Sequence, residues 1–403
     1  MTDRHHRRRA KQSRRDARRR RTRALEEVPE APEEVGLIDG VAQMLDEGHP
    51  LDLLSLVSMM IVATDPRYEA LRAVRGAADD EELAGLDELV AGFIGLEVRE
   101  TTALLAVLAA LLTDDDGGED GPRSRCRRAA EAREDPLPAW LAGLAQTTVY
   151  RAVRMSHILG DGDDVILGVR LADGREFTCV AYIDHLMVSD VKDAFFVPDG
   201  IDAVLAVAEQ NNDDPDTRFT DLDPADARAV IGHGLDQSLR LPPAGDSETW
   251  PSGYALVRWL IGLLPDGGVL QVGPSSSGDT TALLEEFFSS PAGEAFNDFD
   301  HRELLELCIA EGTGDPLRWS APRLEQLLDA SVVGADHLLP LECELDLPEL
   351  LGAYVPFAHA HSGIRASLTD EALVAIDDLG DHYRVTVVQD AVARGDLDED
   401  DLT

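Results

Sequence analysis

The segment from Tyr182 to Asp193 gathers the side chains of this chain that are best suited to chemistry. Asp184 directly precedes His185, and an aspartate can orient a histidine that acts as a general base. Lys192 follows seven residues later and is one of only two lysines beside 34 arginines. Unlike arginine, lysine offers a compact amine that can lose its proton. Asp184, His185 and Lys192 are therefore candidate catalytic residues, and the alternative is a structured loop with local ion pairs.

A second group lies between Asn297 and His301 and contains two carboxylates and an imidazole. These are ordinary metal ligands, so Asp298, Asp300 and His301 are candidates for a metal site. The competing interpretation is a helix N-cap followed by an acidic first turn, which the same order of residues favours.

Two further motifs lack what their chemistry needs. The segment Gly273–Thr280 has the spacing of the phosphate-binding loop GxxxxGK[ST], but Asp279 stands where the lysine should be. A carboxylate there would repel phosphate, so we expect a capped helix start instead. His359 and His361 stand two apart, and a helix would point them about 200° away from each other. We expect neither a shared metal there nor any cofactor.

The elements that must position the first cluster are strands. Val, Ile, Thr and Tyr are frequent in the runs 148–157, 165–171 and 176–183. The inserts between these runs contain Gly and Asp, as hairpin turns do. The pattern predicts an antiparallel meander of three to four strands, in which 194–197 is the fourth.

Helical periodicity dominates the remainder of the chain, and Ala and Leu lead its apolar residues. Apolar residues of 37–112 recur at three- and four-residue steps. Beyond the meander, the pattern predicts helices at 200–210, 224–239, 252–264, 280–290, 300–311, 320–331, 347–360 and 370–393. We therefore predict a mainly α protein with a small antiparallel β-sheet (α+β): an N-terminal helical bundle, a central meander and a C-terminal helical region.

Acidic segments rich in Gly and Pro divide the chain. The predicted parts are a disordered arm and acidic spacer (1–35), a helical domain (36–112), a linker (113–122), an α+β domain with the meander (123–215), a helical domain (216–395) and an acidic tail (396–403). The four cysteines form no CxxC pair, so a reducing cytoplasm is expected. Since no apolar run reaches the roughly 18 residues that a membrane span needs, we expect no membrane association.

The charge of the chain is unevenly distributed. Residues 1–23 contain twelve basic and two acidic side chains, whereas the whole chain carries −42. Closely spaced like charges with no apolar face should keep this arm disordered. Arginine neutralises phosphates and stacks on bases. The candidate nucleic-acid-binding residues are Arg7, Arg8, Arg9, Arg14, Arg15, Arg18, Arg19, Arg20 and Arg21. The alternative is a solubilising tail that pairs with its own acidic body.

Three segments carry a resemblance to known sequences. They are Tyr182–His185 with Val191–Val197, Asp315–Ser320, and His361–Thr369. On these segments the chain resembles a family of uncharacterised proteins from high-GC Gram-positive bacteria, over most of residues 40–390. The resemblance implies no activity, because the family has none assigned. GC-rich coding also agrees with the preference for arginine over lysine.

These observations favour a non-enzymatic cytoplasmic interaction protein whose arm contacts RNA, the ribosome or another polyanion. One alternative is an enzyme or ligand-binding protein with a site near Asp184, His185 and Lys192. Another is a partner of a basic protein, bound through the acidic body of the chain.

Overall fold

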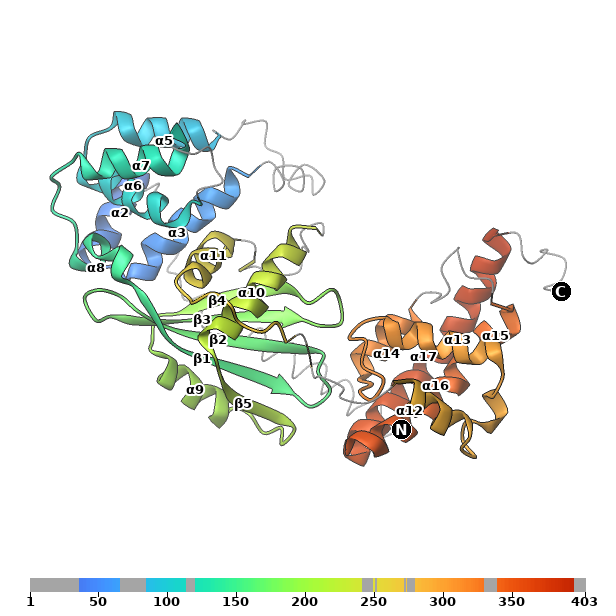
Figure 1. Ribbon diagram of the computed structural model, residues 1–403. Helices are drawn as coiled ribbons and strands as arrows, with labels where there is room; N and C mark the ends of the chain where they lie inside the picture. The colour runs from blue at the N-terminus through green and yellow to red at the C-terminus, as the bar shows by residue number, and fades with distance from the viewer. Residues whose placement is uncertain are drawn as a thin grey trace, which may run out of the picture. The chain divides into compact units, whose positions relative to one another are not determined.

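A computed structural model of the chain describes residues 36–65, 85–113, 120–240, 249–250, 252–271, 273, 280–329 and 339–394 (Figure 1). The predicted arm and spacer, the acidic tail and most of the linker 113–122 lie outside the described residues. The chain divides into two compact units, Met1–Gly48 and His49–Thr403. In the first unit, helix α2 (Leu37–Asp46) begins at Gly36 and ends at Glu47. The predicted domain boundaries stay predictions.

The second unit opens with helices, as expected. They are α3 (Pro50–Ala63), α5 (Leu86–Gly95), α6 (Arg99–Leu111), α7 (Pro122–Glu131) and the short α8 (Ala139–Ala142). His49 begins α3 with a capping box, because its Nδ1 accepts from Leu51 N and Asp52 Oδ2 accepts from His49 N. From Ala103 onward helix α6 is apolar on all sides, and most of it is buried. It packs against α3, α5, α7 and α8 and forms the centre of this part of the core.

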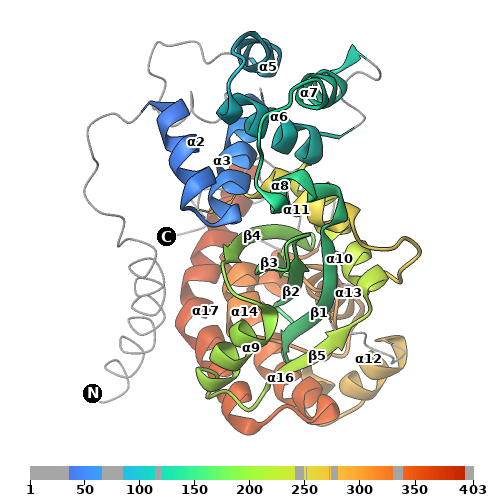
Figure 2. The ribbon, with the colours of Figure 1, turned by 90° about the vertical axis from the view of Figure 1, so that its left-hand side faces the viewer.

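One antiparallel sheet follows, and it confirms the α+β class. Its strands are β1 (Thr148–His157), β2 (Gly162–Arg170), β3 (Glu176–Asp184), β4 (Asp190–Val197) and β5 (Thr217–Leu222). Their order is β4-β3-β2-β1-β5, which Figure 2 shows.

The sheet is larger than the three- to four-stranded meander that we predicted. Strand β4 begins at Asp190 and not at residue 194, so Lys192 lies on a strand. Strand β5 was missed because its acidic surroundings are typical of a linker, yet it pairs with β1 from Ala152↔Leu222 to His157↔Thr217. It follows residue 215, so the sheet extends past the predicted end of the α+β domain.

Helices pack on both faces of the sheet (Figure 1). Helix α9 (Ile201–Gln210) packs on β2 and β3 through Ile201 and Leu205. On the other face, α10 (Pro224–Ser238) contacts β1, β3 and β4, and α11 (Tyr254–Gly262) contacts α10, α3 and α6. A β-bulge lies at Tyr150, between the paired residues Val149 and Arg151 of β1. The Tyr150 hydroxyl accepts from Ile201 N at 3.4 Å at the start of α9.

The C-terminal region is helical, as predicted. It contains α12 (Thr280–Phe288), α13 (Phe299–Ala310), α14 (Ala321–Leu328), α15 (Leu341–Leu345), α16 (Leu347–Ser362) and α17 (Ala366–Arg394). The short α15 was not predicted, and α17 begins four residues earlier than expected. These helices share a core in which the rings of Trp319, Phe287 and Phe357 surround Tyr354. The contacts of Tyr354 with Phe287 and Trp319 are edge-to-face, and such contacts add to the energy of apolar burial.

Gly168 of β2 provides a first test, because α9 approaches the sheet there. A Cβ at this position would lie 2.9 Å from both Ile201 Cγ2 and Tyr150 Cζ. We expect Gly168→Ala to lower the free energy of unfolding by about 1–3 kcal/mol through overpacking. The measurement is chemical denaturation. Gly232→Ala in α10 is the control, since its nearest neighbour would be 3.8 Å away and helix propensity gains up to about 1 kcal/mol. Equal stability of the two variants would contradict this packing.

Candidate functional site

The loop from His185 to Ser189 joins β3 to β4 and positions the predicted cluster. Asp184 and His185 are both buried there. Leu186 N donates to Asp184 Oδ1 at 3.0 Å, and His185 N donates to the carbonyl of Asp161 at 2.9 Å. The first two N–H groups of the loop, those of His185 and Leu186, are therefore both paired.

Asp184 and Lys192 come together, but His185 faces elsewhere. Lys192 Nζ lies 2.5 Å from Asp184 Oδ2, and its side chain remains 48% exposed while that of Asp184 is 4% exposed. This half-exposed cation neutralises a buried carboxylate, which is costly to bury alone. The expected pairing of Asp184 with His185 is not found, since consecutive residues leave a strand on opposite sides.

His185 instead lies between Ser189 and Asp163. Its Nδ1 is 3.0 Å from Ser189 Oγ, and its Nε2 is 3.2 Å from Asp163 Oδ2. The second contact is electrostatic, because the ring nitrogen is not aligned for a hydrogen bond. Arg154 Nε lies 3.5 Å from the same carboxylate oxygen. Asp163 was missed, although the hairpin register, which pairs it with Ile183, could have placed it beside His185.

The surroundings of this cluster are strongly acidic. Burial raises the pKa of Asp161, and burial together with the Asp184 charge raises the pKa of Asp190. Burial, and then the carboxylates of Asp184 and Asp161, raise the pKa of Tyr182 well above its usual value. These strand ends therefore concentrate negative charge, which Lys192 and Arg154 balance in part.

The candidate metal ligands near α13 form a helix cap. Asp298 Oδ1 accepts from His301 N at 3.0 Å, and Asp298 Oδ2 lies 2.6 Å from His301 Nδ1. Burial alone would raise the pKa of Asp298, but its hydrogen bonds with His301 lower it below the usual value. Asp300 lies in the first turn of α13. The structure thus joins Asp298 and His301 in the capping arrangement that was the competing interpretation.

A different group has the spacing of metal ligands. Within the part of the chain that the structure describes, His157, Asp214 and Asp216 form the one such cluster. His157 Nδ1 accepts from Leu159 N at 3.2 Å, so its proton is on Nε2, which faces Asp214 Oδ2 at 3.1 Å. Arg365 pairs with both aspartates. Ion pairs and the histidine tautomer therefore account for this cluster without a metal ion.

His359 and His361 contact different partners, as expected for positions two apart on α16. His359 Nε2 accepts from Trp319 N at 3.2 Å, so its proton is on Nδ1, which lies 2.9 Å from Thr369 Oγ1. Burial lowers the pKa of His359 to about 4. His361 lies 3.2 Å from Glu286 and is more exposed.

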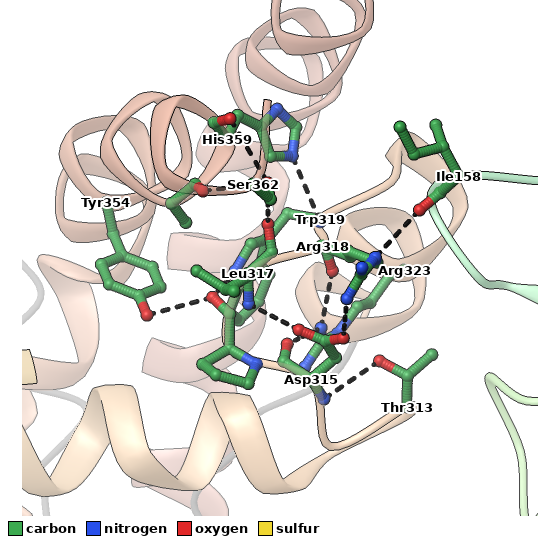
Figure 3. A network of polar contacts seen from close by, with 12 residues as sticks. Ile158, Thr313, Asp315, Leu317, Arg318, Trp319, Arg323, Tyr354, His359 and Ser362 are labelled. Carbon is green, nitrogen blue, oxygen red and sulfur yellow. Dashed lines mark hydrogen bonds and ion pairs between the residues drawn. The ribbon is translucent and has the colours of Figure 1, made fainter. Parts of the chain in front are cut away.

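A buried network surrounds Arg323 beside His359 (Figure 3). Within the described residues, Nη1 and Nη2 of Arg323 donate to backbone carbonyls, and the Trp319 ring lies 4.0 Å from the central carbon of the guanidinium. The acceptors are the carbonyls of Cys308, Ile309, Glu311, Asp315 and Arg318. Three of these lie at the end of α13, so one side chain satisfies carbonyls that the helix leaves unpaired.

Arg318 and Asp315 link this network to the sheet. Arg318 Nη1 pairs with Asp315 Oδ2 at 2.5 Å, while Arg318 Nε donates to the carbonyl of Ile158 at 3.0 Å (Figure 3). Leu159, next in the β1–β2 loop, packs against Ile364 and Leu368. The segments Asp315–Ser320 and His361–Thr369 thus have structural roles that sequence reasoning did not assign.

Two predicted motifs fall largely outside the described residues. These are the segment that resembles a phosphate-binding loop, apart from Gly273 and Thr280, and the whole arginine arm of residues 1–23. Gly273 lies beside His185, since a Cβ there would be 3.9 Å from its ring. All four cysteines are free and buried. Among the described helices, none combines the length and the apolar character that crossing a bilayer requires.

Comparison with known proteins adds no relative: no family model, curated protein or solved structure matches the chain. The resemblance to a family from high-GC Gram-positive bacteria therefore stays a prediction.

The Asp184–Lys192 pair can be tested by removing one charge. We expect Lys192→Gln to lower the free energy of unfolding by about 1–3 kcal/mol, because Asp184 is left buried without its partner. Adding Asp184→Asn should recover part of the loss. Arg128→Gln is the control, since this arginine pairs with Asp120 at the surface, where both side chains are exposed, and its loss should cost under about 1 kcal/mol. Chemical denaturation of the wild type, both single variants Lys192→Gln and Asp184→Asn, the double variant and the control measures the effect, and additive losses would contradict the pairing.

The lowered pKa of His359 predicts a loss of stability in mild acid. In the folded protein the imidazole stays neutral down to about pH 4, whereas in the unfolded chain it binds a proton near pH 6.5. The neutral His359 therefore contributes fully to the free energy of unfolding above about pH 6.5, and this contribution is lost as the pH falls to about 4. It amounts to about 3 kcal/mol.

Denaturation curves between pH 4 and 7 test this dependence. The gap in stability between the wild type and His359→Gln should shrink as the pH falls. The control variant His361→Gln should lose stability with falling pH at least as steeply as the wild type does. The reason is that the pKa of His361 is raised, chiefly by its hydrogen bond to the Phe357 carbonyl. Parallel curves for the wild type and His359→Gln would contradict the assignment.

Proposed function

We propose that the protein is a cytoplasmic interaction protein that binds RNA, or a ribosome through its RNA, by means of residues 1–23. The observation that carries the proposal is the charge of this segment, with twelve basic and two acidic side chains in a chain whose total is −42. Binding to polyanions is driven by the release of their counterions and needs no folded site. The arm is therefore sufficient for the proposed contact.

The acidic remainder limits how the arm can act. A surface with this excess of carboxylates repels nucleic acid at distances within about one Debye length, roughly 8 Å at physiological salt. Contact with a polyanion therefore requires the arm to extend away from the acidic surface. The same surface would oppose binding along the rest of the chain, which confines the contact to the first residues.

RNA is favoured over DNA by the composition of the arm. Its residues include no pattern typical of a groove-reading helix, so sequence-specific reading of a DNA duplex is not expected. Arginine guanidinium groups stack on unpaired bases and pair with phosphates, and such bases are common in folded RNA. Arginine-rich segments can also become ordered on RNA.

Two other functions stay hypotheses beside this one. A basic protein could bind the acidic body, and high salt should then dissolve the complex even without the arm. An enzyme or ligand site near Asp184, His185 and Lys192 would need these side chains to act together. Asp184 contacts Lys192, while His185 has other partners, so the geometry does not favour this site in its original form.

Deleting residues 1–23 tests the proposed function. The full chain should sediment with ribosomes or bulk RNA at low salt and be released as salt rises, because each phosphate contact releases counterions. The deleted chain should stay in the supernatant. Sedimentation with and without prior nuclease treatment measures the effect.

A charge-matched variant separates charge from the loss of residues. Replacing the arm's arginines by lysine keeps its charge and should retain most of the sedimentation, whereas replacement by glutamine should abolish it. If the deleted chain sediments as the full chain does, the arm has no role. Sedimentation that survives nuclease treatment points to a protein partner instead.

A further inference from the structure

The strongest unassigned feature is the row Ser189–His185–Asp163 at the β3–β4 loop. Ser189 Oγ lies 3.0 Å from Nδ1 of His185, and Nε2 on the other side of the ring lies 3.2 Å from Asp163 Oδ2. A hydroxyl, an imidazole and a carboxylate in this order can activate the hydroxyl as a nucleophile. In this arrangement the Ser189 hydroxyl donates to Nδ1 and Nε2 carries the ring proton. Nε2 makes no hydrogen bond to Asp163, so the carboxylate acts on the ring through its charge alone.

The backbone at Ser189 supports a role beyond closing the turn. Ser189 has φ of 60°, and among the described residues it is the one non-glycine residue with a positive φ. This left-handed conformation is unfavourable for a side chain with a Cβ. Such outliers persist where the surrounding structure enforces them, and they concentrate at active sites. Here the conformation directs the serine hydroxyl towards His185.

We propose that Ser189 is the nucleophile of an acyl-transfer site, with His185 as its general base and with the nearby Asp163 carboxylate stabilising the imidazolium by its charge. Ser189 Oγ attacks the carbonyl carbon of an ester and gives its proton to His185 Nδ1. The leaving alcohol takes that proton as the ester bond breaks, which leaves an acyl-serine. Water then attacks the acyl carbon through the same base, which releases a carboxylic acid and restores the serine.

The loop limits the substrate to a small ester with an apolar acyl group. His185 is 2% exposed and Ser189 is 6% exposed, so only a small substrate could reach the hydroxyl. Met187 and Val188, which precede Ser189, are both about half exposed and offer apolar contact to an acyl chain. The loop tip is tethered to α14 by long contacts from Gln326 to the Leu186 carbonyl and to Met187 Sδ.

A fluorophosphonate probe tests the nucleophile directly, because it reacts with activated serines. The full chain is incubated with the probe, and peptide mapping by mass spectrometry locates the adduct. We expect the adduct on Ser189 and none in Ser189→Ala. His185→Gln should lower the rate of labelling at least about 100-fold. The control Ser55→Ala, which removes an exposed serine of α3, should label as the wild type does.

The role of Asp163 requires a readout that a merely structural residue would not change. In Asp163→Asn the maximal inactivation rate should fall at least about tenfold while the probe concentration at half-saturation stays unchanged, because the carboxylate acts on the imidazolium and not on probe binding. Asp163→Glu should recover part of the rate. Hydrolysis of p-nitrophenyl butyrate should follow the same order of variants.

The result that overturns the inference is a wild-type chain, folded by circular dichroism, that gives no Ser189 adduct. Equal labelling in Ser189→Ala would also overturn it. Should a variant fail to fold, the position of the adduct on the wild-type chain still decides. The arm takes no part in this test, so its outcome and that of the sedimentation experiment are independent.

Discussion

The fold of the C-terminal region depends on one buried cation, the guanidinium of Arg323. Five backbone carbonyls accept its hydrogen bonds and an indole ring packs on its face. Burial lowers its pKa to about 10, so it keeps its charge at neutral pH. Without this donor set, carbonyls at the end of α13 and in the loop after it would be buried and unpaired, which costs about 1–3 kcal/mol each. The loop that presents Trp319 to His359 and Tyr354 is held by the same side chain.

The sheet likewise has few cations close to its buried carboxylates. Acidic residues far outnumber basic ones, so each buried carboxylate at the strand ends needs one of the few cations nearby. Lys192 pairs with Asp184, and Arg154 lies beside Asp163. Arg365 pairs in a similar way with the partly exposed Asp214 and with Asp216. The buried polar groups of this protein therefore form separate small clusters, in which a cation lies beside a carboxylate. Any chemistry at His185 would take place within one of these clusters.

The sequence predicted much of this fold, and the failures have physical causes. Val- and Thr-rich runs and Gly-Asp turns located β1, β2 and β3, and Ser320 capped α14 as expected. Strand β5 was missed because an edge strand with exposed Arg218 and Asp221 has no continuous apolar face to reveal it. In the candidate cluster, adjacency suggested that Asp184 serves His185, whereas the pleat separates them. The partners Asp163 and Ser189 depend on hairpin register and a left-handed turn, which adjacency in sequence does not reveal.

The attachment of the β1–β2 loop to distant helices has a consequence for biosynthesis. Arg318 follows its acceptor Ile158 by 160 residues, and Arg365 follows Asp216 by 149. Chains emerge from the ribosome at about 5–20 residues per second, so the sheet waits on the order of ten seconds for these helices. During that interval Leu159 lacks the apolar cover of Ile364 and Leu368. The nascent sheet therefore exposes this apolar corner until the C-terminal helices have been synthesised, and exposed apolar surface of this kind favours aggregation.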